Sequence, residues 1–153
     1  MKIHEYQAKE LLASYGIPVP GGIIAETADQ AFEAAKGFGS CVVKAQVHSG
    51  ARGKAGGVKF ARTPDEAREL ASKILGMTLV TRQTGPEGKL VRKVLISEAV
   101  DVKKEFYLSI TGDSERAGLV IVASAAGGTE IEETAKEHPE AIVQIPVSVI
   151  EGF

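Results

Sequence analysis

The sequence predicts an α/β (α+β) fold in which helices flank mixed sheets. The first half of the chain alternates helical and strand patterns, as βα units do, whereas the second half has short strand patterns separated by turn residues, as hairpins do. At 153 residues the chain is long enough to bury a core of its own. We therefore expect both parallel and antiparallel strand pairs, with helices packed on the sheets.

Three helices are predicted in the first half of the chain. Residues 4–15 place tyrosines and leucines near helical spacing, and a glycine follows them. Thr27 and Gln30 have the spacing of a capping box, which marks the start of a second helix. Thr63 and Glu66 repeat this spacing with a proline between them, and they predict the start of the third helix.

Strand patterns occupy much of the remaining chain. They are rich in apolar and β-branched residues and are bounded by glycine, proline, aspartate or serine, which favour turns. The predicted strands span residues 21–26, 41–45, 56–61, 78–83, 89–99, 104–110, 118–124 and 141–147. A short acidic helix is predicted at 129–137.

Composition argues against several classes of protein. A net charge of −2 disfavours nucleic acid as a partner, because binding to a phosphate backbone needs a basic surface. The longest apolar run, residues 117–128, is too short to span a bilayer, and the N-terminus lacks the apolar segment of a signal peptide. Cys41 has no second cysteine to pair with, which agrees with a reducing compartment. We expect a cytoplasmic protein that binds neither nucleic acid nor membranes.

The segment at residues 44–57, "KAQVHSGARGKAGG", is the strongest candidate site. It contains four glycines, three fixed cations and no acid. Lys44 lies in an apolar strand on the same face as Val42, and burial of its ammonium group is costly unless an anion meets it. Arg52 and Lys54 add hydrogen-bond donors, and the glycines allow backbone N–H groups to converge on phosphate oxygens. Alternatively, Lys44 reaches solvent and the loop is a structural hairpin with surface cations.

This loop does not match two common phosphate-binding motifs. It has His48 where a Walker A loop needs glycine, and Ala55 where that loop needs serine or threonine. It also lacks the GxGxxG pattern of dinucleotide folds. A glycine-rich loop between two strands, with a lysine on the first strand, instead resembles the loop that covers the nucleotide in kinases and ATP-grasp enzymes.

A second candidate site lies at residues 96–105, "ISEAVDVKKE". An apolar strand runs into a connector that contains Glu98, Asp101 and Glu105. The backbone edge of such a connector can hydrogen-bond adenine, and a carboxylate beyond it can accept hydrogen bonds from ribose hydroxyls. Alternatively, these acids only solvate an exposed turn.

Three stretches of the chain together resemble one enzyme family. They are "HEYQAKELLASYGIPVP" at 4–20, "VVKAQVHSGARGKAGGVK" at 42–59 and "DVKKEFYLS" at 101–109. They are similar to the β-subunit of succinyl-CoA synthetase (succinate-CoA ligase); malate-CoA ligase and other ADP-forming acyl-CoA ligases look similar here. The resemblance implies an ATP-grasp fold with two lobes. About residues 20–97 would form the lobe that covers the nucleotide, and residues 1–19 with 98–153 would form part of the second lobe.

The resemblance also implies a reaction. Succinate, CoA and ATP would give succinyl-CoA, ADP and phosphate through a phosphohistidine on a partner α-subunit. No catalytic residue is therefore expected in this chain, and we interpret His48 as a loop or lobe-contact residue. The alternative is a non-catalytic nucleotide-binding or subunit-interaction fragment. A mature eukaryotic form would lie in the mitochondrial matrix.

Nucleotide contacts follow from the same resemblance. The matching positions are Lys44, Ala51, Arg52, Gly53, Ser97, Glu98, Val100 and Glu105. Lys44 would meet phosphates, Val100 would offer its backbone to the base, and Glu105 would face the ribose. The family often has Glu where Ser97 stands, so only a backbone contact is expected at that position. Pro20 and Ala51 match positions linked to nucleotide choice, and their small size favours ATP, with GTP as the alternative.

Magnesium ligands are expected outside this chain. Family β-subunits continue well past Phe153, and the resemblance places the Mg²⁺ ligands and the C-terminal CoA-ligase domain in that continuation. Without Mg²⁺ little neutralises the charge on a transferring phosphoryl group, so the 153-residue chain alone is predicted not to turn over. The glutamates of residues 130–140 are interpreted as a solvated helix face rather than a metal site.

Overall fold

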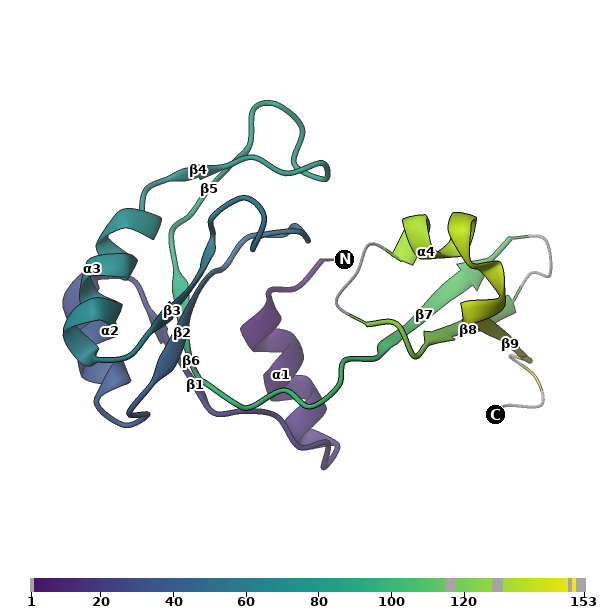
Figure 1. Ribbon diagram of the computed structural model, residues 1–153, viewed down its shortest axis with the longest axis horizontal. Helices are drawn as coiled ribbons and strands as arrows, with labels where there is room; N and C mark the ends of the chain where they lie inside the picture. The colour runs from purple at the N-terminus through teal and green to yellow at the C-terminus, as the bar shows by residue number, and fades with distance from the viewer. Residues whose placement is uncertain (1, 115–117, 128–130, 149, 151–153) are drawn as a thin grey trace. The chain divides into compact units, whose positions relative to one another are not determined.

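The computed structural model describes residues 2–114, 118–127, 131–148 and 150, without the side chains of 132–134. The chain forms two compact units, Met1–Val100 and Asp101–Phe153 (Figure 1). Each unit has its own sheet, and each is described by itself. None of the described helices is long and apolar enough to cross a bilayer.

A four-stranded sheet forms the centre of the first unit. Its strands, in spatial order, are β1 (Gly22–Ala25), β6 (Val94–Glu98), β2 (Cys41–Ala45) and β3 (Val58–Ala61). β6 pairs antiparallel with both β1 and β2, and β2 pairs antiparallel with β3. β6, the last of these four strands along the chain, therefore lies between β1 and β2.

The prediction of mixed sheets is wrong for the described residues, in which every strand pair is antiparallel. Strands β1 and β2 do run in the same direction, as expected for two strands joined by a helix. They do not pair, however, because β6 lies between them. The α/β class and the flanking helices are confirmed.

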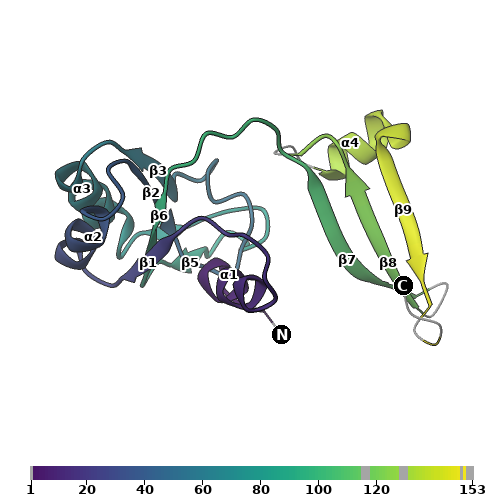
Figure 2. The same ribbon diagram turned by 90° about the horizontal axis from the view of Figure 1, so that it is seen from below.

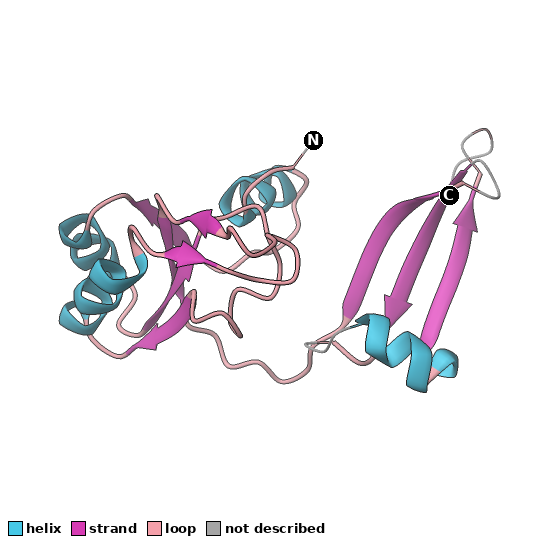
Figure 3. Cartoon of the chain, turned by 90° about the horizontal axis from the view of Figure 1, so that it is seen from above, coloured by secondary structure: helices cyan, strands magenta, loops and turns pink. Residues whose placement is uncertain are grey.

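Two helices cover one face of this sheet. They are α2 (Ala28–Ala35) and α3 (Pro64–Ile74). As predicted, threonine caps both helices: Thr27 Oγ1 accepts a hydrogen bond from Gln30 N, and Thr63 Oγ1 accepts one from Glu66 N, both at 3.2 Å. The two helices lie side by side beside the sheet (Figures 1 and 3).

The core of the first unit lies between these helices and the sheet. The helices contribute mainly alanines, such as Ala31 and Ala67, and the sheet contributes Val43, Val94 and Ile96, all fully buried. Small helix residues allow the helix backbones to approach the strands closely. In β2, buried and half-buried residues alternate, so Lys44 is on the face away from this core, as its strand pattern predicts.

The opposite face of the sheet carries helix α1 (Glu5–Ser14), which was predicted at 4–15. None of its residues is buried. The contacts between this helix and the rest of the unit include four hydrogen bonds, which come from three residues, Glu5, Tyr6 and Lys9. Helix α1 is therefore attached by a small number of polar contacts rather than by a shared apolar core.

Two of the predicted strands are shorter than expected. The strand predicted at 78–83 is only β4 (Thr78–Leu79), and the one predicted at 89–99 divides into β5 (Lys89–Leu90) and β6. β4 and β5 form a separate two-stranded ladder. Between β5 and β6, Val91 N donates to Met77 O at 2.9 Å, which holds the chain as it passes from one sheet to the next.

The second unit is a three-stranded antiparallel sheet with short helices near one end. Its elements are β7 (Tyr107–Asp113), β8 (Gly118–Ser124), α4 (Ile131–Glu137), the 3₁₀ helix η1 (Pro139–Ala141) and β9 (Ile142–Val147). β8 lies between β7 and β9 (Figure 2). The start of the acidic helix predicted at 129–137 falls partly outside the described residues, as does part of the turn before β8.

One face of this second sheet is entirely apolar. Besides Gly112, the register places eight residues on it: Leu108, Ile110, Leu119, Ile121, Ala123, Val143, Ile145 and Val147. Leu108 and Ile110 are 70% and 65% exposed. We call these eight residues the apolar face of the second unit.

Candidate functional site

Lys44 and Arg52 converge on one carboxylate. Lys44 is on β2, Arg52 is in the glycine-rich loop between β2 and β3, and Glu5 is in the first turn of α1. Lys44 Nζ lies 3.0 Å from Glu5 Oε1, and Arg52 Nη2 lies 2.6 Å from Glu5 Oε2. The side chains of Lys44, Arg52 and Glu5 are 27%, 19% and 23% exposed, so all three are only partly solvated. The sequence predicted the two cations but not the acid.

The loop backbone fixes the position of Arg52. Arg52 O accepts a hydrogen bond from Gly57 N at 2.8 Å, and Arg52 Nη1 donates to Ala45 O at 2.7 Å. A Cβ at Gly57 would lie 2.8 Å from Leu79 Cδ1 and 3.1 Å from Ala45 Cβ, so the loop packs closely against β2 and β4 at this glycine. Ala51 has a φ of 55°, in the left-handed region that favours glycine.

The glycine N–H groups do not converge on an open site, contrary to one expectation from the sequence. Gly50 N donates to Gln83 Oε1 at 2.7 Å, and Gly56 N donates to Gly53 O at 3.1 Å. The N–H groups of Gly50, Gly56 and Gly57 therefore all donate to acceptors within the chain. In this conformation the positive side chains supply the donors that face the site.

Glu5 is ionised more readily than an ordinary glutamate. Burial opposes ionisation and would raise the pKa of its carboxyl, but the hydrogen bonds and positive charges of Lys44 and Arg52 outweigh burial and lower the pKa. The result is a charged cluster in which two fixed cations share one carboxylate.

Lys9 adds a third cation beside this cluster. Its Nζ donates to Ser97 Oγ at 3.3 Å. Burial lowers the pKa of Lys9, and the charge of Lys44 lowers it further, against the opposing charges of Glu5 and Glu98. Glu5 and Lys9 are one helical turn apart, which puts them on one face of α1. The spacing of Glu5 and Lys9 could be seen in the sequence, but the residues that they contact could not be predicted from it.

The predicted connector residues lie at the end of β6. Ser97 is buried, and its Oγ donates to Gly21 O at 3.1 Å, so its side chain already has a protein partner. Glu98 N also donates to Gly21 O, at 3.0 Å. Val100 is half exposed and ends the first unit. Glu105 belongs to the second unit, where its carbonyl accepts a hydrogen bond from Gly127 N at 3.2 Å.

His48 stacks on a second histidine. Its ring lies 4.0 Å from that of His4, centroid to centroid, with 16° between the planes. Burial lowers the pKa of His4, and the charges of His48, Lys93 and Arg52 lower it further. His48 therefore makes a contact between the loop and the N-terminus, in agreement with its interpretation as a loop-contact residue.

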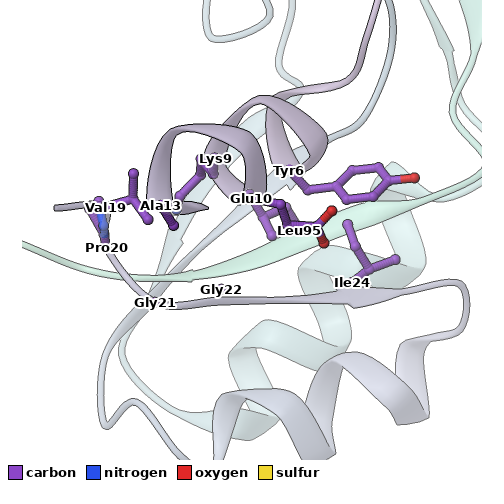
Figure 4. Close-up of a pocket in the computed structure, with 10 residues that line it drawn as sticks. All are labelled: Tyr6, Lys9, Glu10, Ala13, Val19, Pro20, Gly21, Gly22, Ile24 and Leu95. Atoms are coloured by element: carbon purple, nitrogen blue, oxygen red, sulfur yellow. The ribbon is translucent and has the colours of Figure 1, made fainter. Parts of the chain in front are cut away.

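Two cavities flank helix α1 in the first unit. One, of about 240 Å³, lies between α1 and strands β1 and β6 and is lined by residues that include Tyr6, Lys9, Pro20 and Leu95 (Figure 4). The other, of about 280 Å³, is lined by residues that include Glu5 and Arg52. The charged cluster thus borders a polar cavity on one side of the helix, while Pro20 borders a more apolar one.

The described residues have no cluster of metal-binding side chains. They contain no group of three or more His, Cys, Asp or Glu side chains placed to hold a metal. The acids near the site are used differently, since Glu5 is paired with two cations. No metal-dependent step is therefore assigned to these residues.

The chain is similar to curated β-subunits named succinate–CoA ligase [ADP-forming]. It is 55% identical over 155 aligned residues to that of Sulfurovum sp. strain NBC37-1 and 54% identical over 158 to that of Halalkalibacterium halodurans. These alignments cover 100% of this chain but only 40% and 41% of the two relatives. The chain therefore spans about two-fifths of their length, and the resemblance noted in its three stretches is confirmed.

Solved structures share the fold at low sequence identity. An acetyl-coenzyme A synthetase 1 of Ca. Korarchaeum cryptofilum, described as dinucleotide forming and in complex with coenzyme A and Ca-AMPCP, has a TM-score of 0.71 at 20% identity, covering 94% of this chain and 59% of that one. The Methanosaeta concilii ATP citrate lyase D541A mutant, in complex with (3S)-citryl-CoA, has a TM-score of 0.65 at 20% identity, covering 99% of this chain and 34% of that one.

A match to a domain family also spans nearly the whole chain. Residues 2–153 match the ATP-grasp domain family. The glycine-rich loop with its strand lysine and the flanking helices lie within this match. Because the match spans nearly the whole sequence, the chain belongs to the ATP-grasp domain family.

Proposed function

We propose that this chain is the nucleotide-binding part of an ADP-forming succinate-CoA ligase β-subunit. The observation that carries the proposal is the convergence of Lys44 and Arg52 on one carboxylate at the edge of a cavity. Two fixed cations and a neighbouring Lys9 suit an anion with more charge than one carboxylate, and a nucleotide polyphosphate is such an anion. Membership of the ATP-grasp family and the succinate–CoA ligase relatives support ATP as that nucleotide.

The complete reaction belongs to the longer protein. The β-subunit would join succinate and CoA at the expense of ATP, with phosphate passing through a phosphohistidine on a partner α-subunit. The present chain would bind and orient the nucleotide and would supply no catalytic residue. Mg²⁺, when bound in the complete subunit, would neutralise phosphate charge through ligands elsewhere. The bacterial relatives support a cytoplasmic location.

In the proposal, different residues of this chain contact the phosphates, the base and the ribose of the nucleotide. Lys44 and Arg52 hold phosphate oxygens, and the planar guanidinium can donate two parallel hydrogen bonds to one phosphate. The full proposed set is Lys44, Ala51, Arg52, Gly53, Ser97, Glu98, Val100 and Glu105. Backbone groups of the connector contact the base, and Glu105 accepts from the ribose. Pro20 lines the cavity beside α1, which supports a role in the choice between ATP and GTP.

The two-lobe arrangement is also a proposal. About residues 20–97 form the lobe that covers the nucleotide, and 1–19 with 98–153 contribute to the other lobe. The sheet β1–β6–β2–β3, with its loop between β2 and β3, supports the first assignment. The division of the chain after Val100 supports a boundary near the connector.

Substitution of the two cations tests the proposal. Lys44→Ala and Arg52→Ala should each weaken ATP binding about 10- to 100-fold, because each removes a charge-assisted hydrogen bond to phosphate. Isothermal titration of the 153-residue chain with ATP measures this. Lys59→Ala, an exposed cation on β3, is the matched control and should bind as the wild type does. Unchanged affinity in both site variants would refute the assignment.

A fragment without turnover is the second candidate. It is favoured because the described residues hold no metal-binding cluster and because the chain spans about two-fifths of its relatives. The chain would then bind nucleotide, or an acyl-CoA ligase α-subunit, without forming succinyl-CoA or malyl-CoA. Mixing the chain with an α-subunit, succinate or malate, CoA and Mg-ATP should give no thioester above the α-subunit control. Product formation would refute this candidate.

A further inference from the structure

The Glu5 carboxylate lies between Lys44 and Arg52, at the position where an external anion would be expected to bind. Its two carboxylate oxygens are divided between Lys44 Nζ at 3.0 Å and Arg52 Nη2 at 2.6 Å. Its partners lie 39 and 47 residues away in the sequence, on a strand and in a loop. A carboxylate that bridges an ammonium and a guanidinium makes the same kind of hydrogen bonds as a phosphate oxygen pair.

The charge of this cluster is not balanced by Glu5. Lys44 and Arg52 together carry two positive charges against its single negative charge, and Lys9 is close enough for its pKa to respond to Lys44 and Glu5. A di- or triphosphate carries more negative charge than one carboxylate, so it meets these cations with a larger Coulomb attraction. The exchange of Glu5 for such an anion is therefore electrostatically favourable.

Helix α1 is attached in a way that permits this exchange. It has no buried residue, and Gly16, with a φ of 77°, follows its end. Two of its hydrogen bonds are long: Tyr6 N donates to Gln46 Oε1 and Lys9 Nζ donates to Ser97 Oγ, both at 3.3 Å. The bond from Arg52 Nη2 to Glu5 Oε2 is shorter, at 2.6 Å, so Glu5 makes the closest of these contacts. Glu5 and Arg52 both line the cavity of about 280 Å³, which gives an incoming anion access to the cations.

We propose that Glu5 is an exchangeable counterion: it holds Lys44 and Arg52 in place in the free protein, and a nucleotide polyphosphate binds by displacing it. This inference rests on the proposed nucleotide-binding function and adds a residue that opposes binding. Arg52 stays positioned during the exchange, because its Nη1 donates to Ala45 O rather than to Glu5. Lys44 is positioned by its place on β2. Glu5 thus keeps the site ordered and selects anions that carry more than one charge.

The Glu5→Gln variant tests the exchange by isothermal titration with ATP, ADP and inorganic tripolyphosphate. Removal of the competing charge should tighten binding of ATP and tripolyphosphate about tenfold. Glu69→Gln is the matched control, because it breaks an exposed ion pair with Lys73 on α3 and should leave affinity unchanged. If the wild type binds ATP and Glu5→Gln binds it equally or more weakly, the exchange is refuted while nucleotide binding stands. If neither protein binds ATP or tripolyphosphate, the proposed function itself fails.

A second measurement uses the unmodified chain and so does not depend on the folding of a variant. Carbon-detected NMR follows the titration of the Glu5 carboxyl with and without saturating tripolyphosphate. The charged groups around it are Lys44, Arg52 and Lys9, together with Lys2 and His48 in the cavity lining. Displacement from the two cations should raise the titration midpoint of Glu5 toward that of an ordinary glutamate. A midpoint that is unchanged or lower in the bound state would overturn the inference.

Discussion

Ala51 is the described residue, other than glycine, that has a positive φ. An L-residue in the left-handed region costs about 1 kcal/mol relative to glycine. The cost is stored next to Arg52, whose backbone carbonyl closes the loop by accepting from Gly57 N. The hydrogen bonds and packing at the ends of the loop therefore hold Ala51 in a backbone conformation that alanine does not favour.

Substitution of Ala51 should reveal this strain. Ala51→Gly should raise the free energy of unfolding by up to about 1 kcal/mol, because relief of strain exceeds the added freedom of the unfolded chain. Ala51→Val should lower it, since a β-branched residue fits the left-handed region poorly. Urea denaturation measures both. Gly53→Ala is the control: a Cβ there meets open space, and its φ is ordinary. Destabilisation by Ala51→Gly would contradict this account.

At the scale of elements, the N-cap of α1 couples the helix to the loop. His4 stacks on His48, and among the described residues its buried Nδ1 has no hydrogen-bond partner. Its lowered pKa arises from burial and from the charges of His48, Lys93 and Arg52. Below the ordinary histidine pKa of about 6.5 the unfolded chain therefore binds more protons at this residue than the folded chain does.

Stability should consequently fall as the pH drops from 7.5 to 5.5. His4→Asn removes the titrating ring but keeps a residue that favours the N-cap position, so it should reduce the pH dependence. Urea midpoints at the two pH values, for the wild type and for His4→Asn, measure the difference. His138→Asn, which removes a ring from the second unit, serves as the control variant. An equal loss of stability in the wild type and in His4→Asn would rule out His4 as the source.

Local signals in the sequence predicted elements better than partners. The two threonine caps follow from residues three positions apart, so the starts of α2 and α3 were predictable. The insertion of β6 between β1 and β2 was not, because no local pattern states which strand pairs with which. In the candidate site, Lys44 and Arg52 could be predicted from their loop. Glu5 could not, because its pairing depends on a tertiary contact across the unit.

At the scale of the whole molecule, the apolar face of the second unit is a large exposed surface. Its residues from three strands lie side by side, and Leu108, Ile110 and Val143 are more than half exposed. Contiguous apolar surface of this kind is unusual on a soluble monomer and promotes association.

The isolated chain should therefore bind the dye ANS at neutral pH without being unfolded. Leu108→Thr with Ile110→Thr should lower the dye fluorescence severalfold and reduce self-association, because both residues are exposed and threonine retains strand propensity. Fluorescence titration and analytical ultracentrifugation measure the two effects. Ser109→Thr, on the opposite face of β7, is the control. Equal dye binding by all three proteins would locate the apolar surface elsewhere.

The central position of β6 also determines when the first unit can fold. Gly22 pairs with Ser97 and Cys41 with Glu98, so the ladders that join β1 and β2 close only after residue 98 has left the ribosome. Until then, β1 and the β2–β3 hairpin have no common partner. Contacts between residues so distant in sequence slow folding, because the entropy of closing a long loop must be overcome before they form. The sheet that carries Lys44 therefore cannot be completed until β6 has been synthesised.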